Sequence, residues 1–332
     1  MGKITTYEKG DLFKQYIDNA NNTLRILVTK KCNSSCKYCF EEGSIGSTNY
    51  MPELLDNADF RNIILAGKHL GVNRVTLSGG EPTLNFSCVE SLVDLCVNEN
   101  IPVYLTTNAT DNRIINLARK YPSLEFRISL ESSKENYKNY RGIDKFDEVI
   151  KNLKDLSSCT NEIVINRVVT SLKTEWEDFN NFVNLIKNEK INSTNVYLKM
   201  IPCLANNIAE DLPIISYVDY LSKMNPGLKI NICQKKFQFF YDFKYNDVNI
   251  LIRTKGVHSP KCCLSKDTFC DEGIAWTRIN PNGVIQPCYN IFMDTINHGD
   301  AIPTIEKKLS KSREFMKGLY IENYDIKSNL GL

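Results

Sequence analysis

The sequence has no long apolar run and almost no net charge. At its start there is no basic segment followed by an apolar one. Without about 18 consecutive apolar residues it offers no candidate membrane span. Residues 1–22 are polar and charged, unlike a secretory signal. We therefore expect a cytoplasmic protein whose cysteines are thiols or metal ligands, because disulfides are rare in a reducing cytosol.

The net charge of +2 comes from 41 basic and 39 acidic residues that are spread along the chain. Because they form no basic block or stripe, we expect no nucleic-acid polymer as a partner. A few arginines inside a pocket can still bind a small anion without changing the total charge. The apolar fraction of 42% is that of a globular protein with a full core.

Apolar runs rich in β-branched and aromatic residues alternate with segments of helical spacing, which is the pattern of repeated βα units. Six strands are predicted, at Leu24–Thr29, Arg74–Ser78, Val103–Thr107, Glu125–Leu130, Ile163–Thr170 and Val196–Ile201. Helices are predicted at Leu54–Leu70, Val89–Asn98, Arg113–Tyr121, Phe146–Leu156 and Trp176–Lys187. This order predicts an α/β fold, a partial (β/α)6 TIM-type barrel with its ligand site at the carboxyl ends of the strands.

The alternation weakens after Ile201, and the chain divides into four expected regions. They are an N-terminal extension at 1–22, the barrel at 23–202, a connector at 203–254 with a helix near Ser216–Met224, and a small cysteine-bearing domain at 255–332. Prolines and a glycine in the third region favour the interpretation as a connector.

Three cysteines, Cys32, Cys36 and Cys39, form a C-x3-C-x2-C pattern just after the first predicted strand. A 4Fe-4S cluster normally takes four cysteine ligands, so three leave one iron open to another ligand. A zinc site is the alternative, although structural zinc takes four closed ligands, usually from C-x2-C pairs. The spacing therefore favours an iron-sulfur cluster with one reactive iron.

This cysteine pattern, followed by Phe40, resembles the signature of the radical S-adenosylmethionine (radical SAM) superfamily, and the run Leu77–Pro82 resembles its GGEP motif. The resemblance implies that the amino and carboxylate groups of SAM chelate the open iron and that Tyr38 lies against the adenine. It also implies that the GGEP residues hydrogen-bond the methionine amino group of SAM. Those residues are Gly79, Gly80, Glu81 and Pro82.

The same resemblance assigns SAM-contacting positions to the later strands. Each of these polar residues could instead satisfy backbone groups at a strand end. The positions are Asn108 on the third strand, Ser129 and Glu131 on the fourth near the ribose, Asn166 and Arg167 on the fifth for the carboxylate, and Met200 on the sixth near the adenine.

In the last region Cys270, Gly283 and Cys288 form C-x12-G-x4-C, and Pro-Asn-Gly at 281–283 predicts a hairpin. This resembles the element with which SPASM and twitch domains build an auxiliary 4Fe-4S cluster, so we expect a small C-terminal iron-sulfur auxiliary domain. The further ligand is expected to be Cys263, or alternatively Cys262. No cysteine follows Cys288, which leaves the fourth ligand open and a second SPASM cluster unexpected. Buried thiols are the alternative for this group.

The chain also resembles the MoaA-type GTP 3',8-cyclases. Arg25 lies seven residues before Cys32, where the cyclases have an arginine that contacts nucleotide phosphates, and Arg278 matches one of their paired arginines. Both arginines are therefore candidate substrate contacts. Because Trp276 stands where the other paired arginine is expected, we predict a paralogue that is not a GTP cyclase.

The leading expectation is a radical SAM enzyme of oxidoreductase or lyase type. It would cleave SAM reductively to a 5'-deoxyadenosyl radical, which abstracts hydrogen from a small metabolite or nucleotide near the auxiliary cluster. One alternative is a maturase that oxidises or crosslinks a ribosomal peptide, and the short segment before the first strand favours the small molecule. The alternative of another class is a non-catalytic iron-sulfur redox sensor, which needs neither GGEP nor Asn166 and Arg167. An electron donor such as flavodoxin or ferredoxin is the expected partner.

Overall fold

The computed structural model describes residues 23–39, 53–169, 175–191, 196–202, 214–235, 238–253, 276–288 and 291–329, and it contains the six predicted βα units. The strands are β1 (Thr23–Leu27), β2 (Arg74–Ser78), β3 (Val103–Thr107), β4 (Glu125–Ser129), β5 (Ile163–Val169) and β6 (Val196–Pro202). The helices are α2 (Asn57–His69), α3 (Phe86–Asn98), α4 (Arg113–Lys120), α5 (Lys134–Arg141), α6 (Phe146–Ser157) and α7 (Glu175–Asn188). Only α5 was not predicted, because its sequence KENYKNYR has too few apolar residues to give a helical stripe.

The rest of the described chain extends the sheet at both edges. Its elements are α8 (Ile214–Met224), β7 (Asn231–Lys235), β8 (Gln238–Tyr245), β9 (Val248–Arg253), β10 (Trp276–Ile279), β11 (Ile285–Gln286) and α9 (Ile302–Asn329). The region predicted as a connector thus contains the expected helix, α8, and also three strands. The predicted hairpin is present between β10 and β11, with Gly283 at a φ of 83°.

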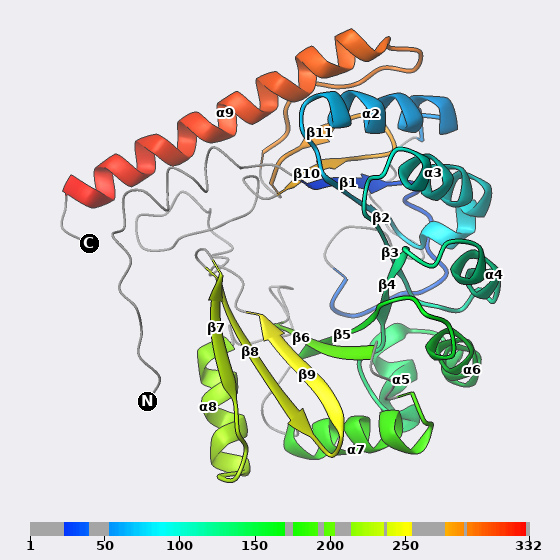
Figure 1. Cartoon of the computed structure of the whole chain (residues 1–332), viewed down its shortest axis with the longest axis vertical. Helices are drawn as coiled ribbons and strands as arrows, with labels where there is room; N and C mark the ends of the chain where they lie inside the picture. The colour runs from blue at the N-terminus through cyan, green and yellow to red at the C-terminus, as the bar shows by residue number, and fades with distance from the viewer. Residues whose placement is uncertain are drawn as a thin grey trace.

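Within the described residues these strands form an 11-stranded sheet in the order β11-β10-β1-β2-β3-β4-β5-β6-β9-β8-β7. Neighbouring strands from β10 to β9 are parallel, whereas β11, β8 and β7 pair antiparallel at the edges. The sheet curves into an arc, with α2, α3, α4, α6 and α7 along its outer side (Figure 1). This is the predicted partial TIM-type barrel. No helix in the described part of the chain has the length and apolarity to span a membrane.

Alternate residues of the parallel strands face opposite sides of the arc. On β1, Leu24 and Ile26 are buried in the apolar core, where Leu24 packs against Gly67 of α2. The residue between them, Arg25, is only half-buried, and the same alternation recurs on β4, where Ser129 follows the buried Ile128. The inner face of the arc therefore carries the polar side chains.

The C-terminal part is held to the barrel at the start of α2. Asp59, which is 3% exposed, forms a capping box with Asp56 and accepts hydrogen bonds from Gly299 N (2.9 Å) and His298 Nδ1 (2.8 Å). Further along, α9 lies beside α2 (Figure 1), and Arg313 donates to the carbonyl of Leu70 at 2.7 Å. Burial raises the pKa of Asp59, but these hydrogen bonds together hold it below its ordinary value.

We predict that Asp59→Ala lowers the free energy of unfolding by about 2 kcal/mol near neutral pH, because a helix cap and a buried tie are lost together. A carboxyl group whose pKa is lower in the folded than in the unfolded protein stabilises the fold at any pH above its unfolded-state pKa. This stabilisation is lost as the pH falls through the folded-state pKa. The stability difference between wild type and variant should thus shrink as the pH is lowered to about 3. Chemical denaturation across this range measures it, with the exposed Asp155→Ala as control; an unchanged difference would contradict the assignment.

Candidate functional site

Cys32, Cys36 and Cys39 lie on the loop that follows β1, and all three are half-buried thiols. Burial raises the pKa of Cys32, and it raises that of Cys36 to about 11. Three thiols on one short loop are the ligand set that three irons of a 4Fe-4S cluster would take, with the fourth iron left open.

The C-terminal end of α5 holds this loop in place. Ser35 N donates to the carbonyl of Arg141 at 3.0 Å, and Lys37 N donates to the carbonyl of Tyr140 at 3.2 Å. Gly142 caps the helix with a φ of 68°, and a Cβ atom there would lie 1.9 Å from Ser35 Oγ. A glycine is therefore required where helix and loop meet.

The two glycines of the GGEP motif allow a second close backbone contact with the same loop. Gly80 N donates to Thr29 O at 2.9 Å, and Glu81 N donates to Lys31 O at 2.7 Å. A Cβ atom at Gly79 would lie 2.3 Å from Thr29 O, and one at Gly80 would lie 2.1 Å from Lys31 O. Any side chain at these positions would push the start of the cysteine loop away.

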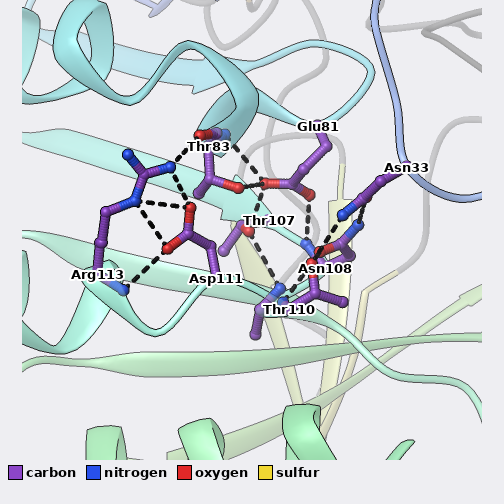
Figure 2. A network of polar contacts seen from close by, with 9 residues as sticks. Asn33, Glu81, Thr83, Thr107, Asn108, Thr110, Asp111 and Arg113 are labelled. Atoms are coloured by element: carbon purple, nitrogen blue, oxygen red, sulfur yellow. Dashed lines mark hydrogen bonds and ion pairs between the residues drawn. The ribbon is translucent and has the colours of Figure 1, made fainter. Parts of the chain in front are cut away.

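Glu81 joins this turn to the end of β3. It is 1% exposed, and its Oε1 accepts hydrogen bonds from Thr83 and from Thr107 Oγ1 (2.7 Å), while its Oε2 accepts from Asn108 N (2.8 Å). The next residue, Pro82, begins the short 3-10 helix η1 (Pro82–Asn85). Burial raises the pKa of Glu81 in spite of these donors. Figure 2 shows the carboxylate between its donors Thr83, Thr107 and Asn108.

Asn108 continues the network to the cysteine loop. Its Nδ2 donates to Asn33 Oδ1 at 2.7 Å and to Ser34 Oγ at 3.2 Å, and its Oδ1 accepts from Thr110 N at 3.0 Å. Asn33 in turn donates to Thr110 Oγ1 at 3.0 Å, so loop and strand end are linked twice (Figure 2). The contact of Asn108 with SAM stays a prediction, and in the structure this residue positions the loop.

On the next two strands, the inner face carries unsatisfied acceptors. Ser129 and Asn166 are neighbours in the register of β4 and β5, and Glu131 is the second residue after the end of β4. Glu131 Oε2 and Asn166 Oδ1 are buried without a hydrogen-bond partner. Buried oxygens of this kind need a donor. Arg141 Nη1 lies 3.6 Å from Glu131 Oε2, which is ion-pair distance but beyond hydrogen-bond distance.

Arg167 has a different partner from the one predicted. It shares its side of β5 with the buried core residues Ile163 and Ile165, and its guanidinium forms a bidentate pair with Glu175 of α7. Because successive strand residues alternate between faces, Arg167 points to the helix side and Asn166 to the inner side. In the structure Arg167 binds the carboxylate of Glu175, and its contact with the carboxylate of SAM stays a prediction. Met200 of β6 is the register neighbour of Arg167.

Arg25 and Arg278, the two candidate substrate contacts, are brought together by the pairing of β1 with β10. They are direct neighbours in the parallel register. Their guanidinium carbons lie 5.9 Å and 5.8 Å from the centroid of the Trp276 ring, and Arg25 Nε donates to Ser78 Oγ at 3.0 Å. Of the C-terminal cysteines, Cys288 is described and buried after β11, whereas Cys262, Cys263 and Cys270 lie outside the described residues.

Several residues that shape the site are not predicted by the sequence patterns. Asn33 and Thr107 belong to no motif and gain their roles only when β3 meets the cysteine loop. Arg141 was missed together with α5. The sequence does contain end signals for this helix, with Ser133 in the N-cap position and Gly142 after the last turn, and they could have indicated it.

Comparisons with known proteins agree with this geometry. The family model of the Radical SAM superfamily matches residues 26–186. The probable GTP 3',8-cyclase of Pyrococcus horikoshii is 33% identical over 149 residues, which are 44% of this chain and 46% of that protein, so about half of its length is spanned. The probable GTP 3',8-cyclase of Saccharolobus islandicus is 30% identical over 221 residues, covering 65% of this chain and 68% of that protein.

A solved structure, Streptococcus suis SuiB bound to S-adenosylmethionine, has a similar fold. Its TM-score is 0.60 at 19% identity, and the match covers 84% of this chain and 63% of SuiB. At this identity the likeness concerns the fold alone, and it agrees with the partial barrel described above.

We predict that Gly80→Ala destabilises the protein by about 1–3 kcal/mol, since the new methyl group meets backbone atoms that have no room to move. The cysteine loop should be displaced as well, so that anaerobic reconstitution yields less iron per chain. Gly318→Ala is the matched control, because a Cβ atom there meets nothing within 4 Å. Equal stability and equal iron uptake in the two variants would show that the close contact at Gly80 is unimportant.

Proposed function

The chain belongs to the radical SAM superfamily, and on this basis we propose that it cleaves SAM reductively and uses the 5'-deoxyadenosyl radical to take hydrogen from a small anionic metabolite or nucleotide. The cofactors of the superfamily are a 4Fe-4S cluster and SAM. When bound they supply one electron and a carbon radical, while the protein orients the reactants and excludes water.

The residues around the cysteine loop fit these cofactors. Cys32, Cys36 and Cys39 would hold three irons, and Tyr38 lies on the same loop. The unsatisfied oxygens of Glu131 and Asn166 would accept hydrogen bonds from the hydroxyl and ammonium groups of SAM. Gly79, Gly80, Glu81 and Asn108 would serve by fixing the loop against β2 and β3.

The pairing of Arg25 with Arg278 carries the proposal of an anionic substrate. Both residues lie on the inner face, β1 leads directly into the cysteine loop, and the β10–β11 hairpin leads to Cys288. Two neighbouring guanidinium groups suit a phosphate or carboxylate, which each can bind with two hydrogen bonds. A substrate held by these arginines would lie on two neighbouring strands, one leading to the first group of cysteines and the other leading to Cys288.

A second cluster completes the proposal. Cys288 would hold it together with Cys270 and either Cys263 or Cys262, with one coordination position left for another ligand. The support is the hairpin that carries Cys288 and the burial of this residue at 2% exposure. This second cluster would either bind the substrate near the arginine pair or exchange an electron with it.

The first test is SAM cleavage by anaerobically reconstituted protein with dithionite. We expect about eight irons per chain and formation of 5'-deoxyadenosine. Cys32→Ala should abolish cleavage, because the first cluster loses a ligand. Cys288→Ala should retain some uncoupled cleavage with about four irons. Cys159→Ala, a half-buried cysteine outside both groups, is the control. Wild-type protein with a full cluster and no 5'-deoxyadenosine would support a redox sensor instead.

The second test concerns the arginine pair, with GTP and inorganic pyrophosphate as anionic probes and guanosine as the uncharged comparison. Losing a charged hydrogen bond costs about 1.5–3 kcal/mol, so Arg25→Gln or Arg278→Gln should weaken binding of the anions about tenfold to a hundredfold. Guanosine binding should change little. The exposed Arg119→Gln is the control, and equilibrium binding is the measurement. Anion binding that is the same in all variants would remove this pair from substrate recognition.

A further inference from the structure

Glu131, whose carboxylate the proposed function already uses, forms a buried ion pair with Arg141, which has no role in that function so far. Arg141 Nη1 lies 3.6 Å from Glu131 Oε2, and their side chains are 6% and 1% exposed. The same Nη1 donates to Tyr38 Oη at 3.0 Å. Since a buried pair interacts in a medium of low effective dielectric, its field reaches nearby groups with little screening.

The position of Arg141 relative to Cys36 is fixed from two directions. Its carbonyl accepts the hydrogen bond of Ser35 N, the residue before Cys36, and its guanidinium bonds Tyr38, two residues after Cys36. The guanidinium is therefore held beside the second cysteine of the loop. Glu131 lies two residues after the end of β4, and its backbone carbonyl accepts a hydrogen bond from Arg167 Nε at 2.9 Å.

Both members of the pair are buried against the loop, so water screens neither charge. Arg141 Nη1 donates to Tyr38 of the loop, and Glu131 Oε2 lies 3.6 Å from the same Nη1. Arg167, also buried, is balanced by its bidentate partner Glu175.

We propose that the Arg141–Glu131 pair sets the reduction potential of the cluster that the proposed function assigns to Cys32, Cys36 and Cys39. Reduction adds one negative charge to the cluster. A buried cation beside the cluster stabilises the reduced state and raises the potential, whereas a buried anion lowers it. Removing the charge of Arg141 should lower the potential, and removing that of Glu131 should raise it.

The test is a redox titration of the reconstituted protein without SAM, followed by electron paramagnetic resonance. Arg141→Gln should lower the equilibrium constant for reduction about tenfold, which is 59 mV for one electron. Glu131→Gln should shift it in the opposite direction, and Arg141→Lys should stay near wild type because the charge is kept. Lys134→Gln is the control, since this exposed lysine on the same helix is screened by water and salt.

Shifts of opposite sign identify an electrostatic role, because a merely structural disturbance has no reason to reverse with the sign of the removed charge. Shifts of the same sign in Arg141→Gln and Glu131→Gln, or none in either, would overturn the proposal. If Arg141→Gln takes up no cluster, Glu131→Gln compared with Arg141→Lys still decides, since only the former should raise the potential. Failure of the wild-type protein itself to bind a cluster would instead refute the proposed function.

Discussion

The site depends on a close approach of backbone segments at the carboxyl ends of the strands. The cysteine loop contacts the turn after β2 through Gly80 and Glu81 and contacts the end of α5 through Arg141. Both contacts require glycines, because a Cβ atom at Gly80 or Gly142 would lie about 2 Å from the loop. A loop with three thiols would otherwise be free to take many conformations. Backbone hydrogen bonds to the turn after β2 and to the end of α5 restrict the loop before any cofactor binds. Less conformational entropy is therefore lost when a cofactor binds.

Buried polar side chains also hold this arrangement in place, and their contacts differ between the inner face and the helix side of the sheet. Glu81 and Asn108 satisfy backbone and side-chain donors inside the protein and hold the strand ends together. Arg167 does the same on the helix side through Glu175. The Oε2 atom of Glu131 and the Oδ1 atom of Asn166, in contrast, are buried without a hydrogen-bond partner. Residues that look alike in the sequence therefore make different contacts according to the face of the strand on which they lie.

The six strands from β1 to β6 and most of the helices between them could be predicted, because buried parallel strands give apolar runs and their helices give clear stripes. α5 could not, since it packs few apolar side chains and is recognisable mainly by its ends. The strands β7 to β9 and the helix α9 were not predicted. The pairing of Arg167 with Glu175 could not be predicted without the alternation of β5, which turns Arg167 toward α7. The cysteine loop and GGEP motif are local in sequence and were found from it. The pairing of Arg25 with Arg278 joins residues 253 positions apart, and only the parallel register of β1 and β10 brings them together.

The central claim is that the loop holds a 4Fe-4S cluster with one iron left open for SAM. Electron paramagnetic resonance of the reduced, reconstituted Cys288→Ala protein, in which the auxiliary site is disabled, tests it most directly. The account predicts a 4Fe-4S signal whose shape changes when SAM is added, because a new ligand joins the open iron. A signal that is identical with and without SAM, or the absence of a cluster from this variant, would contradict it.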